Sequence, residues 1–391
     1  MMIFKLAYKN IVGAGFRTWL NIFILSLAYF GIISLQGFFI GWKDDASREI
    51  KEWDISGGQY WQENYDSYDP FSYEDSHAYI PEELISEIEK MEAVPILLTP
   101  ATIYPGGRMR SIVMKGIDPD QKLLKIPTKY LSENEAQLKC IIGKRMADNL
   151  KLQQGDFVTV RWRDKHGTFD AVDVKIAHVF ETTVLTVENN QIWIPLHTLQ
   201  DMLELPGEAS IIVVKNEDFA PKLAGWEHKD INFLLQDLNS MIQAKTIGSS
   251  IMYLLLLFLA MIAIFDTQIL SIFRRRREMG TMMALGMTRS KIIRLFTLEG
   301  SLHAILAILL GAIYGIPLLK YFQKVGMNIG VDAAEFGMSG LDDALYPVYG
   351  WKLVAGTIIL VLITTTIVSF LPTRKIAKLK PTDALRGKMT K

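Results

Sequence analysis

The chain has 391 residues, half of them hydrophobic, and its mean hydropathy of +0.19 is high for a soluble protein that carries this many charges. The 42 basic residues balance the 42 acidic residues, so the bulk charge indicates neither a nucleic acid nor an acidic partner. A single cysteine, Cys140, excludes an internal disulfide and a cysteine-based metal site, and we expect it to be a buried or idle thiol.

The first apolar run covers residues 18–42 and contains no charge between Arg17 and Lys43. It is long enough to cross a bilayer core of about 30 Å. It is too long for the apolar part of a signal peptide, and no small-residue cleavage site follows it, which predicts an uncleaved signal anchor. Before it, residues 1–17 are expected to form a cytoplasmic interfacial helix, because Lys5 and Lys9 share one helical face.

Residues 43–245 are numerous enough to form a domain with its own core. Alternating apolar residues and turn signals predict strands at 111–116, 139–143, 156–162, 172–176, 191–194 and 210–214, with a hairpin turn at 165–167. Helical spacing predicts helices at 81–91, 144–150 and 196–203. The fold class expected from the whole chain is therefore membrane α-helical, with a large mixed α+β domain inserted between the first and second of four transmembrane helices.

Aromatic residues are dense between Trp53 and Tyr79, where they alternate with acidic and small residues. We favour a packed segment that covers the domain core. A surface for an amphipathic ligand or partner is the alternative interpretation.

Three further apolar runs, at 246–273, 299–320 and 352–373, are also long enough to span a membrane. Basic residues cluster before the first run, between the second and third, and after the fourth. The positive-inside rule places all three clusters in the cytoplasm. The loop 274–298 and the tail 374–391 are therefore expected inside with both termini, and the segments 43–245 and 321–351 outside.

The loop 274–298 has the pattern of two short helices joined at a turn. Gly286 is suited to end one helix, and Thr288 to cap the start of the next. Ile292, Leu295 and Phe296 then fall on one face. Such a helix, lying across the membrane surface, would serve a cytoplasmic partner. A basic loop that only fixes the topology is the alternative.

Polar and small residues inside the runs suggest how the helices pack. Gly311 and Gly315 have GxxxG spacing, which permits close helix approach. Asp266 is an intramembrane acid, which is a functional candidate by default, but we favour a structural pair with Arg274 or Arg275. His303 is expected to hydrogen-bond a neighbouring helix.

The motifs of common enzymes do not occur in the sequence. No Gly-x-x-x-x-Gly-Lys-Ser/Thr loop is present to hold ATP phosphates, no Gly-x-Ser-x-Gly occurs, and the six histidines lack the spacing of a zinc site. We expect no catalytic residue and no metal site in this chain. If ATP drives it, another chain must supply the ATP site.

Several short motifs together resemble the MacB/FtsX-type (type VII) permeases of ABC transporters. They are Glu278-Met279-Gly280, Ala284-Leu285-Gly286-Met287, Ile292 with Glu299-Gly300, Lys115-Gly116-Ile117-Asp118-Pro119, and Pro372-Thr373-Arg374 with Leu379-Lys380-Pro381. The outer domain resembles most closely that of the lipoprotein-releasing (Lol-type) permeases, on the segments Pro195 to Gly207, Trp226 and Asn232-Phe233. The hairpin at 165–168 is short for the hook by which one such permease recruits its periplasmic chaperone.

The resemblance implies a permease subunit of the inner (cytoplasmic) membrane, without an ATP site of its own, that works by mechanotransmission. The implied partners are a cytoplasmic ATPase dimer that binds ATP and Mg, a second permease copy or homologue, membrane lipid, and a periplasmic chaperone or adaptor. The implied activity is extraction of lipoproteins; MacB-like export of peptides, toxins or drugs and FtsX-like regulation of a cell-wall hydrolase are the alternatives. The residues implied to couple the chain to the ATPase are Glu278, Gly280, Leu285, Gly286, Arg289, Ile292, Leu295 and Glu299.

Overall fold

The computed structural model describes residues 16–132, 137–327 and 344–376. Within these ranges the chain forms two compact units, one made of residues 16–42, 241–327 and 344–376, and one made of residues 43–132 and 137–240. Residues 1–15 of the interfacial helix expected at residues 1–17, the middle of the loop 321–351 and the tail after residue 376 lie outside the described residues.

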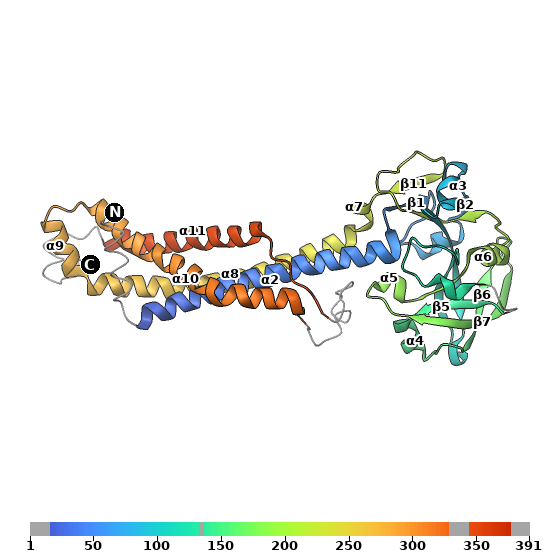
Figure 1. The fold of residues 1–391 in the computed structure, drawn as a ribbon, viewed down its shortest axis with the longest axis horizontal. Coiled ribbons are helices and arrows are strands. Elements are labelled where there is room, and N and C mark those ends of the chain that lie inside the picture. The colour runs from blue at the N-terminus through green and yellow to red at the C-terminus, as the bar shows by residue number, and fades with distance from the viewer. Residues whose placement is uncertain (1–15, 133–136, 328–343, 377–391) are drawn as a thin grey trace. The chain divides into compact units, whose positions relative to one another are not determined.

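Within the described residues, the first unit is made largely of long apolar helices, together with one short helix (Figure 1). Their bounds are α2 (Phe16–Ile50), α8 (Gln236–Arg274), α9 (Arg276–Ala284), α10 (Arg289–Val325) and α11 (Trp351–Ile376). Four of them, α2, α8, α10 and α11, are long and apolar enough to cross a membrane, and the α/β domain lies between the first and second of them in the chain. The predicted fold class is confirmed.

The helices continue beyond the apolar runs that predicted them. Helix α2 ends at Ile50 rather than at residue 42, and α8 begins at Gln236 rather than at residue 246. Hydropathy marks the part of a helix that fits the bilayer, whereas charged residues outside the bilayer extend a helix without adding to that signal.

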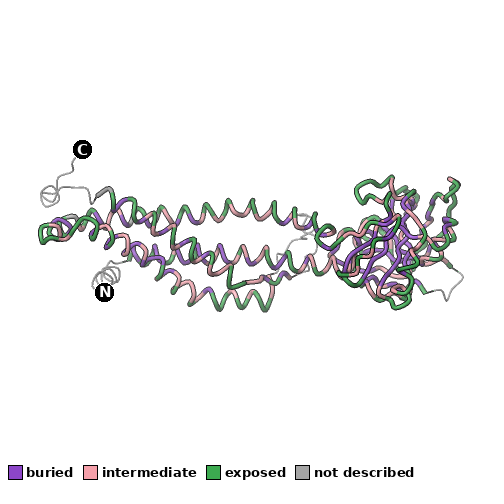
Figure 2. The backbone as a smooth tube through the Cα atoms, turned by 90° about the horizontal axis from the view of Figure 1, so that it is seen from above, coloured by how far each residue is buried: buried purple, intermediate pink, exposed green. Residues whose placement is uncertain are grey.

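The four long helices pack through one apolar core, to which each contributes. Its buried residues include Leu25 of α2, Ala260 of α8, Leu302 of α10 and Val361 of α11. Away from this core the helix surfaces are largely exposed, as the green and pink stretches of Figure 2 show. An apolar exposed surface of this kind is suited to contact with lipid.

Small and hydroxylated residues bring the helices close together. Gly311 and Gly315 of α10 lie against Ser26 and Phe30 of α2. The hydroxyls of Ser26 and Tyr314 are 3.1 Å apart. In a bilayer, such polar contacts between helices replace the hydrogen bonds that water would otherwise supply.

The second unit is built on a mixed nine-stranded sheet. Its strands are β1 (Gly58–Gln62), β3 (Ala93–Ile103), β4 (Arg110–Ile117), β5 (Lys139–Gly143), β6 (Phe157–Arg163), β7 (Phe169–Phe180), β8 (Gln191–Pro195), β10 (Ile211–Val214) and β11 (Trp226–Lys229). The order is β11-β1-β10-β3-β4-β8-β5-β7-β6, and β3 also pairs with β6. This extra pairing closes six of the strands, from β3 to β6, into a barrel.

The barrel encloses an apolar core because its strands alternate. On β6, Val158, Val160 and Trp162 are buried. On β7, Val174 and Ile176 are buried. The hairpin between β6 and β7 turns at residues 164–168, as predicted, and Gly167 has a φ of 82° that favours glycine.

The remaining elements cover the sheet and its ends. They are β2 (Ala78–Tyr79) paired with β9 (Glu208–Ala209), α3 (Glu82–Glu89), α4 (Lys144–Leu150), α5 (Leu185–Glu188), α6 (Leu196–Leu203), α7 (Ile231–Leu234), η1 (Lys51–Ile55), η2 (Pro70–Glu74), η3 (Pro105–Gly107) and η4 (Thr128–Leu131). Cys140 on β5 is fully buried, as expected, and burial raises the pKa of its thiol to about 12.

The aromatic segment 53–79 mainly covers the domain core, in agreement with the favoured interpretation. Trp53 stacks on Phe180, with ring centroids 5.7 Å apart, and Tyr60 is fully buried. Tyr68, Phe71 and Tyr79 are exposed. The segment is therefore a packed cover with an aromatic outer surface.

Candidate coupling site

The loop between the second and third long helices forms a compact cap of its own. Helix α8 ends at Arg274, α9 follows after one residue, and α10 starts at Arg289. Gly286 lies just after α9 with a φ of 91°, a backbone conformation that favours glycine. Thr288 occupies the N-cap position of α10, as predicted, although its side chain makes no capping hydrogen bond.

The predicted second helix of the loop is not a separate element. Residues 289–298 are the first part of α10, which runs without a break into the membrane span. The separate short helix is α9, before Gly286 rather than after it. No helix-breaking residue stands between Arg289 and the apolar run, so the hydrogen-bonded ladder continues.

The apolar face of this segment is turned inward. Ile292 and Leu295 are each only 1% exposed. Ile292 packs with Ile272, Met279 and Phe296 in a small core under the turn. In this conformation the chain itself covers Ile292 and Leu295, two of the residues implied to couple it to the ATPase, so neither side chain is exposed to another protein.

Flexible methionines complete this small core. Met282, Met283 and Met287 are half-buried against it. Methionine side chains adapt to irregular and changing spaces better than branched residues do. The cap is thus held together by contacts that tolerate small rearrangements.

A half-buried cation, Arg275, fixes the cap to α10. Arg275, between α8 and α9, donates from Nη1 to Glu299 Oε2 at 2.9 Å and from Nε to Glu278 Oε2 at 2.8 Å. Its guanidinium also lies 5.0 Å from the centroid of the Phe296 ring. Burial alone would lower the pKa of Arg275, but Glu278 and Glu299 raise it, so the guanidinium stays charged. One side chain therefore ties α8, α9 and α10 together.

Glu299 and Gly300 are both buried inside the helix bundle. Glu299 is 4% exposed. At Gly300, an added Cβ atom would collide with the side chain of Ser369 on α11. Of the residues expected to contact the ATPase, Glu299 is thus a buried anchor, and Gly280 is likewise buried.

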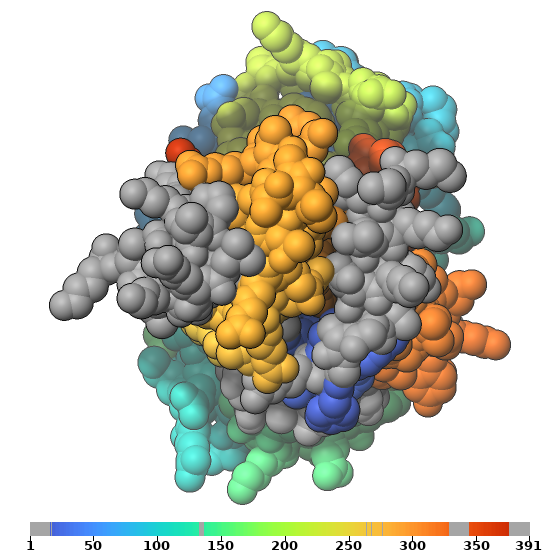
Figure 3. All heavy atoms as spheres, turned by 90° about the vertical axis from the view of Figure 1, so that its left-hand side faces the viewer, coloured from blue at the N-terminus to red at the C-terminus, as the bar shows by residue number. Residues whose placement is uncertain are grey.

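The exposed part of the cap is the turn and the start of α10. Leu285 is 83% exposed although it is apolar. Gly286, Arg289 and Lys291 are exposed beside it. This cap, orange in Figure 3, stands at the surface that faces the viewer. We call residues 284–291 the exposed turn. An apolar side chain next to two cations is suited to bind an acidic groove of another protein.

The intramembrane candidates lie apart from this cap core. Asp266 on α8 is exposed and, among the described residues, makes no ion pair. The expected pair with Arg274 or Arg275 is therefore wrong for the described residues, and Arg275 binds Glu278 and Glu299 instead. His303 is buried, and its Nδ1 is 2.8 Å from the carbonyl oxygen of Glu299 on its own helix rather than from a neighbouring helix.

Sequence reasoning did not identify the role of Arg275 or a second glycine pair, Gly37 and Gly41. An added Cβ at either glycine would collide with the segment 346–349, and Val348 N donates to Gly37 O at 3.0 Å. The GxxxG spacing of Gly37 and Gly41 was a signal that could have predicted this contact. Arg275 and Glu299 are 24 positions apart, and no local pattern connects them.

Comparison with known proteins finds a family that matches part of the first unit. Residues 250–381 match the family described as FtsX-like permease C-terminal. The macrolide export ATP-binding/permease protein MacB of Burkholderia lata is 27% identical over 222 residues, which are 51% of this chain and 29% of that protein. An uncharacterized ABC transporter permease of Methanocaldococcus jannaschii, MJ1507, is 26% identical over 131 residues, which are 34% of this chain and 30% of that protein. YknZ of Bacillus subtilis, also described as an uncharacterized ABC transporter permease, is 29% identical over 125 residues, or 32% of this chain and 27% of that protein. The matched regions thus span less than a third of each of these relatives.

Proposed function

We propose that this chain is an ABC transporter permease of the FtsX/MacB family, on the match of residues 250–381 to the FtsX-like permease C-terminal model. We propose that it couples ATP hydrolysis by a separate ATPase chain to shape changes of its extracytoplasmic domain. The exposed turn is the contact for the ATPase. The observation that supports this proposal most directly is that Leu285, an apolar residue, is 83% exposed beside exposed cations. The cap that carries Leu285 is tied to α10 by the bond between Arg275 and Glu299. Force applied to the turn would therefore reach the membrane helices.

Mechanotransmission is supported by the continuity of the helices. Helix α10 joins the exposed turn to the membrane span without a break, and α2 and α8 continue from the apolar runs into the residues of the α/β domain. Stiff helices transmit displacement along their axis better than loops do. We propose that the complex lies in the inner membrane with two permease subunits and an ATPase dimer that binds ATP and Mg.

For the substrate, we propose lipoproteins that are extracted from the membrane, on the sequence resemblance to Lol-type permeases. Export of a macrolide-like molecule is the second candidate, which is favoured by the relatives named MacB. For either candidate, we propose that the substrate is taken up at the outer side of the membrane. A periplasmic chaperone or adaptor would accept either one.

A double variant of the exposed turn tests the ATPase contact. Leu285→Asp with Arg289→Glu changes only exposed side chains and leaves the cap core intact. We expect the ATPase that co-purifies with the tagged chain from membranes to fall at least tenfold, together with the ATP hydrolysis of the preparation. Lys324→Glu, an exposed charge reversal at the other end of α10, is the matched control and should retain both. Wild-type yield of the ATPase with the double variant would contradict the proposal.

A further inference from the structure

The second unit, which forms the α/β domain, contains a cavity that the proposed coupling to the ATPase does not involve. Its volume is about 600 Å³, within the range of roughly 300–1,000 Å³ that is typical of small-molecule sites. Its walls come from the aromatic segment, from β4 and β10, and from residues around the start of α8. We call it the aromatic cavity.

Aromatic rings form a preassembled apolar wall of this cavity. Trp61 contacts Tyr65 edge-on, with centroids 4.9 Å apart, and Phe233 at 5.7 Å. Tyr65 stacks on Tyr73 at 5.5 Å. Because these four rings hold one another in place, an apolar ligand could bind without first ordering them.

Lys115 supplies a charge to the same cavity. It lies on β4, half-buried, with its ammonium 4.9 Å from the centroid of the Trp193 ring. Its Nζ makes neither a hydrogen bond nor an ion pair with any described residue. Two other lysines of this unit, in contrast, have carboxylate partners: Lys125 contacts Glu52, and Lys144 contacts Glu181 at 2.8 Å. Burial lowers the pKa of Lys115, and Asp54 partly offsets this.

The carboxylates that line the cavity already have partners. Asp237 accepts a hydrogen bond from the Tyr68 hydroxyl at 2.6 Å. Asp54 Oδ2 accepts from the Thr186 hydroxyl at 3.5 Å. Among the charged groups that line the cavity, the ammonium of Lys115 is therefore the one that lacks a hydrogen-bond partner among the described residues. Partial burial of an unpaired charge costs free energy, which a ligand of opposite charge would offset.

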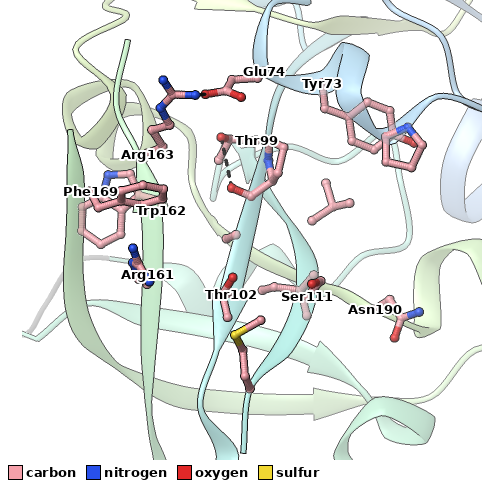
Figure 4. A pocket seen from close by; sticks show the side chains of 16 residues that line it. Tyr73, Glu74, Thr99, Thr102, Ser111, Arg161, Trp162, Arg163, Phe169 and Asn190 are labelled. Atoms are coloured by element: carbon pink, nitrogen blue, oxygen red, sulfur yellow. Dashed lines mark hydrogen bonds and ion pairs between the residues drawn. The ribbon is translucent and has the colours of Figure 1, made fainter. Parts of the chain in front are cut away.

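In a neighbouring cavity, by contrast, the cationic side chains already contact other groups of the protein (Figure 4). It has a volume of about 530 Å³ and is lined by Arg161 and Arg163. Arg163 is already paired with Glu74 at 2.9 Å, and Arg161 lies 4.1 Å over the ring of Phe169. Its cations are engaged by the protein, whereas Lys115 is open to a hydrogen-bonding ligand.

We propose that the aromatic cavity binds an amphipathic anion. A carboxylate or phosphate of the ligand accepts hydrogen bonds from the Lys115 ammonium, and its apolar part packs on the wall of Trp61, Tyr65, Tyr73 and Phe233. A charge-assisted hydrogen bond of this kind is shorter and stronger than a neutral one. The proposal that the cavity binds such a ligand is argued from the cavity alone. Only the further statement that the ligand is a transported substrate rests on the proposed function.

Fluorine NMR of the full-length chain in maltoside detergent tests this site. Tryptophans are replaced by 5-fluorotryptophan, and the signals of Trp61 and Trp193 are assigned by Phe substitution. Octanoate and octyl phosphate represent the carboxylate and phosphate sources, with octanol and octyltrimethylammonium as the uncharged and cationic comparisons. We expect saturable shifts of both signals with at least one anion, and the tighter anion identifies the source.

Variants of Lys115 separate a charge contact from detergent-like binding. Lys115→Met should raise the Kd of the preferred anion at least tenfold, Lys115→Arg should keep binding within threefold of the wild type, and Lys122→Met, an exposed lysine of the same unit, should leave it unchanged. Equal affinity for octanol, tighter binding of octyltrimethylammonium, or loss of affinity in Lys115→Arg would overturn the proposal. Because no ATPase is present, this result is independent of the test of coupling.

Discussion

Arg275 is the residue on which the structure of the cap depends most. Its side chain is 18% exposed and that of Glu299 is 6% exposed, so their ion pair is largely shielded from water. Removal of one partner leaves the other as an uncompensated buried charge, which typically costs about 3–5 kcal/mol. We therefore expect Arg275→Ala to lower the free energy of unfolding by about 3 kcal/mol, measured by denaturant unfolding of the purified chain in detergent.

Glu278→Gln is the matched control for this prediction. Glu278 also binds Arg275, but its side chain is 60% exposed, and exposed pairs contribute less than about 1 kcal/mol. If Arg275→Ala and Glu278→Gln had equally small effects, Arg275 would be a surface residue in solution, and the cap would not be tied to α10 in the way described.

At the scale of the element, the packing of α10 on α11 depends on a glycine. A Cβ atom at Gly300 would collide with Ser369 and approach Gln268 of α8, so Gly300→Ala overpacks three helices at one point. We expect it to destabilise the chain by about 1–3 kcal/mol. Gly356→Ala on α11 has open space around its Cβ and should be neutral or stabilising by up to about 1 kcal/mol, because alanine favours the helix. Thermal unfolding followed by helical circular dichroism compares the two, and a lower midpoint for Gly356→Ala than for Gly300→Ala would contradict this account.

The elements differ in how far the sequence predicts them. Strands such as β6 were predictable, because one face is buried and the residues alternate. The central strand β3 was missed because it is buried on both faces and contains Pro95 and Pro100, which normally argue against a central strand. Both prolines nevertheless occupy paired positions, opposite Ile212 and Val113.

The candidate site was predictable only in part, for a related reason. Periodicity showed that Ile292, Leu295 and Phe296 share one helical face, and the structure agrees. It did not show whether the same chain or another chain covers that face. The answer depends on Ile272 of α8 and Met279 of α9, and the sequence carries no signal that either residue contacts α10.

At the scale of the whole molecule, the proposed function requires that the exposed turn and the α/β domain lie on opposite sides of the membrane. The positive-inside rule predicts the turn in the cytoplasm. The chain is suited to cysteine labelling, because Cys140 is fully buried and the raised pKa of its thiol keeps it unreactive. New cysteines at exposed positions can then be compared without removing it.

Lys122→Cys in the α/β domain and Lys291→Cys in the exposed turn are the matched pair, since both side chains are exposed. In intact cells whose outer barrier admits the reagent, we expect a membrane-impermeant maleimide to label Lys122→Cys and to leave Lys291→Cys unlabelled. Permeabilising the cytoplasmic membrane should make both react to a similar extent. Labelling of Lys291→Cys in intact cells would place the turn outside, where a cytoplasmic ATPase could not reach it. The four long helices would still be present, but they could no longer carry force from ATP hydrolysis to the α/β domain.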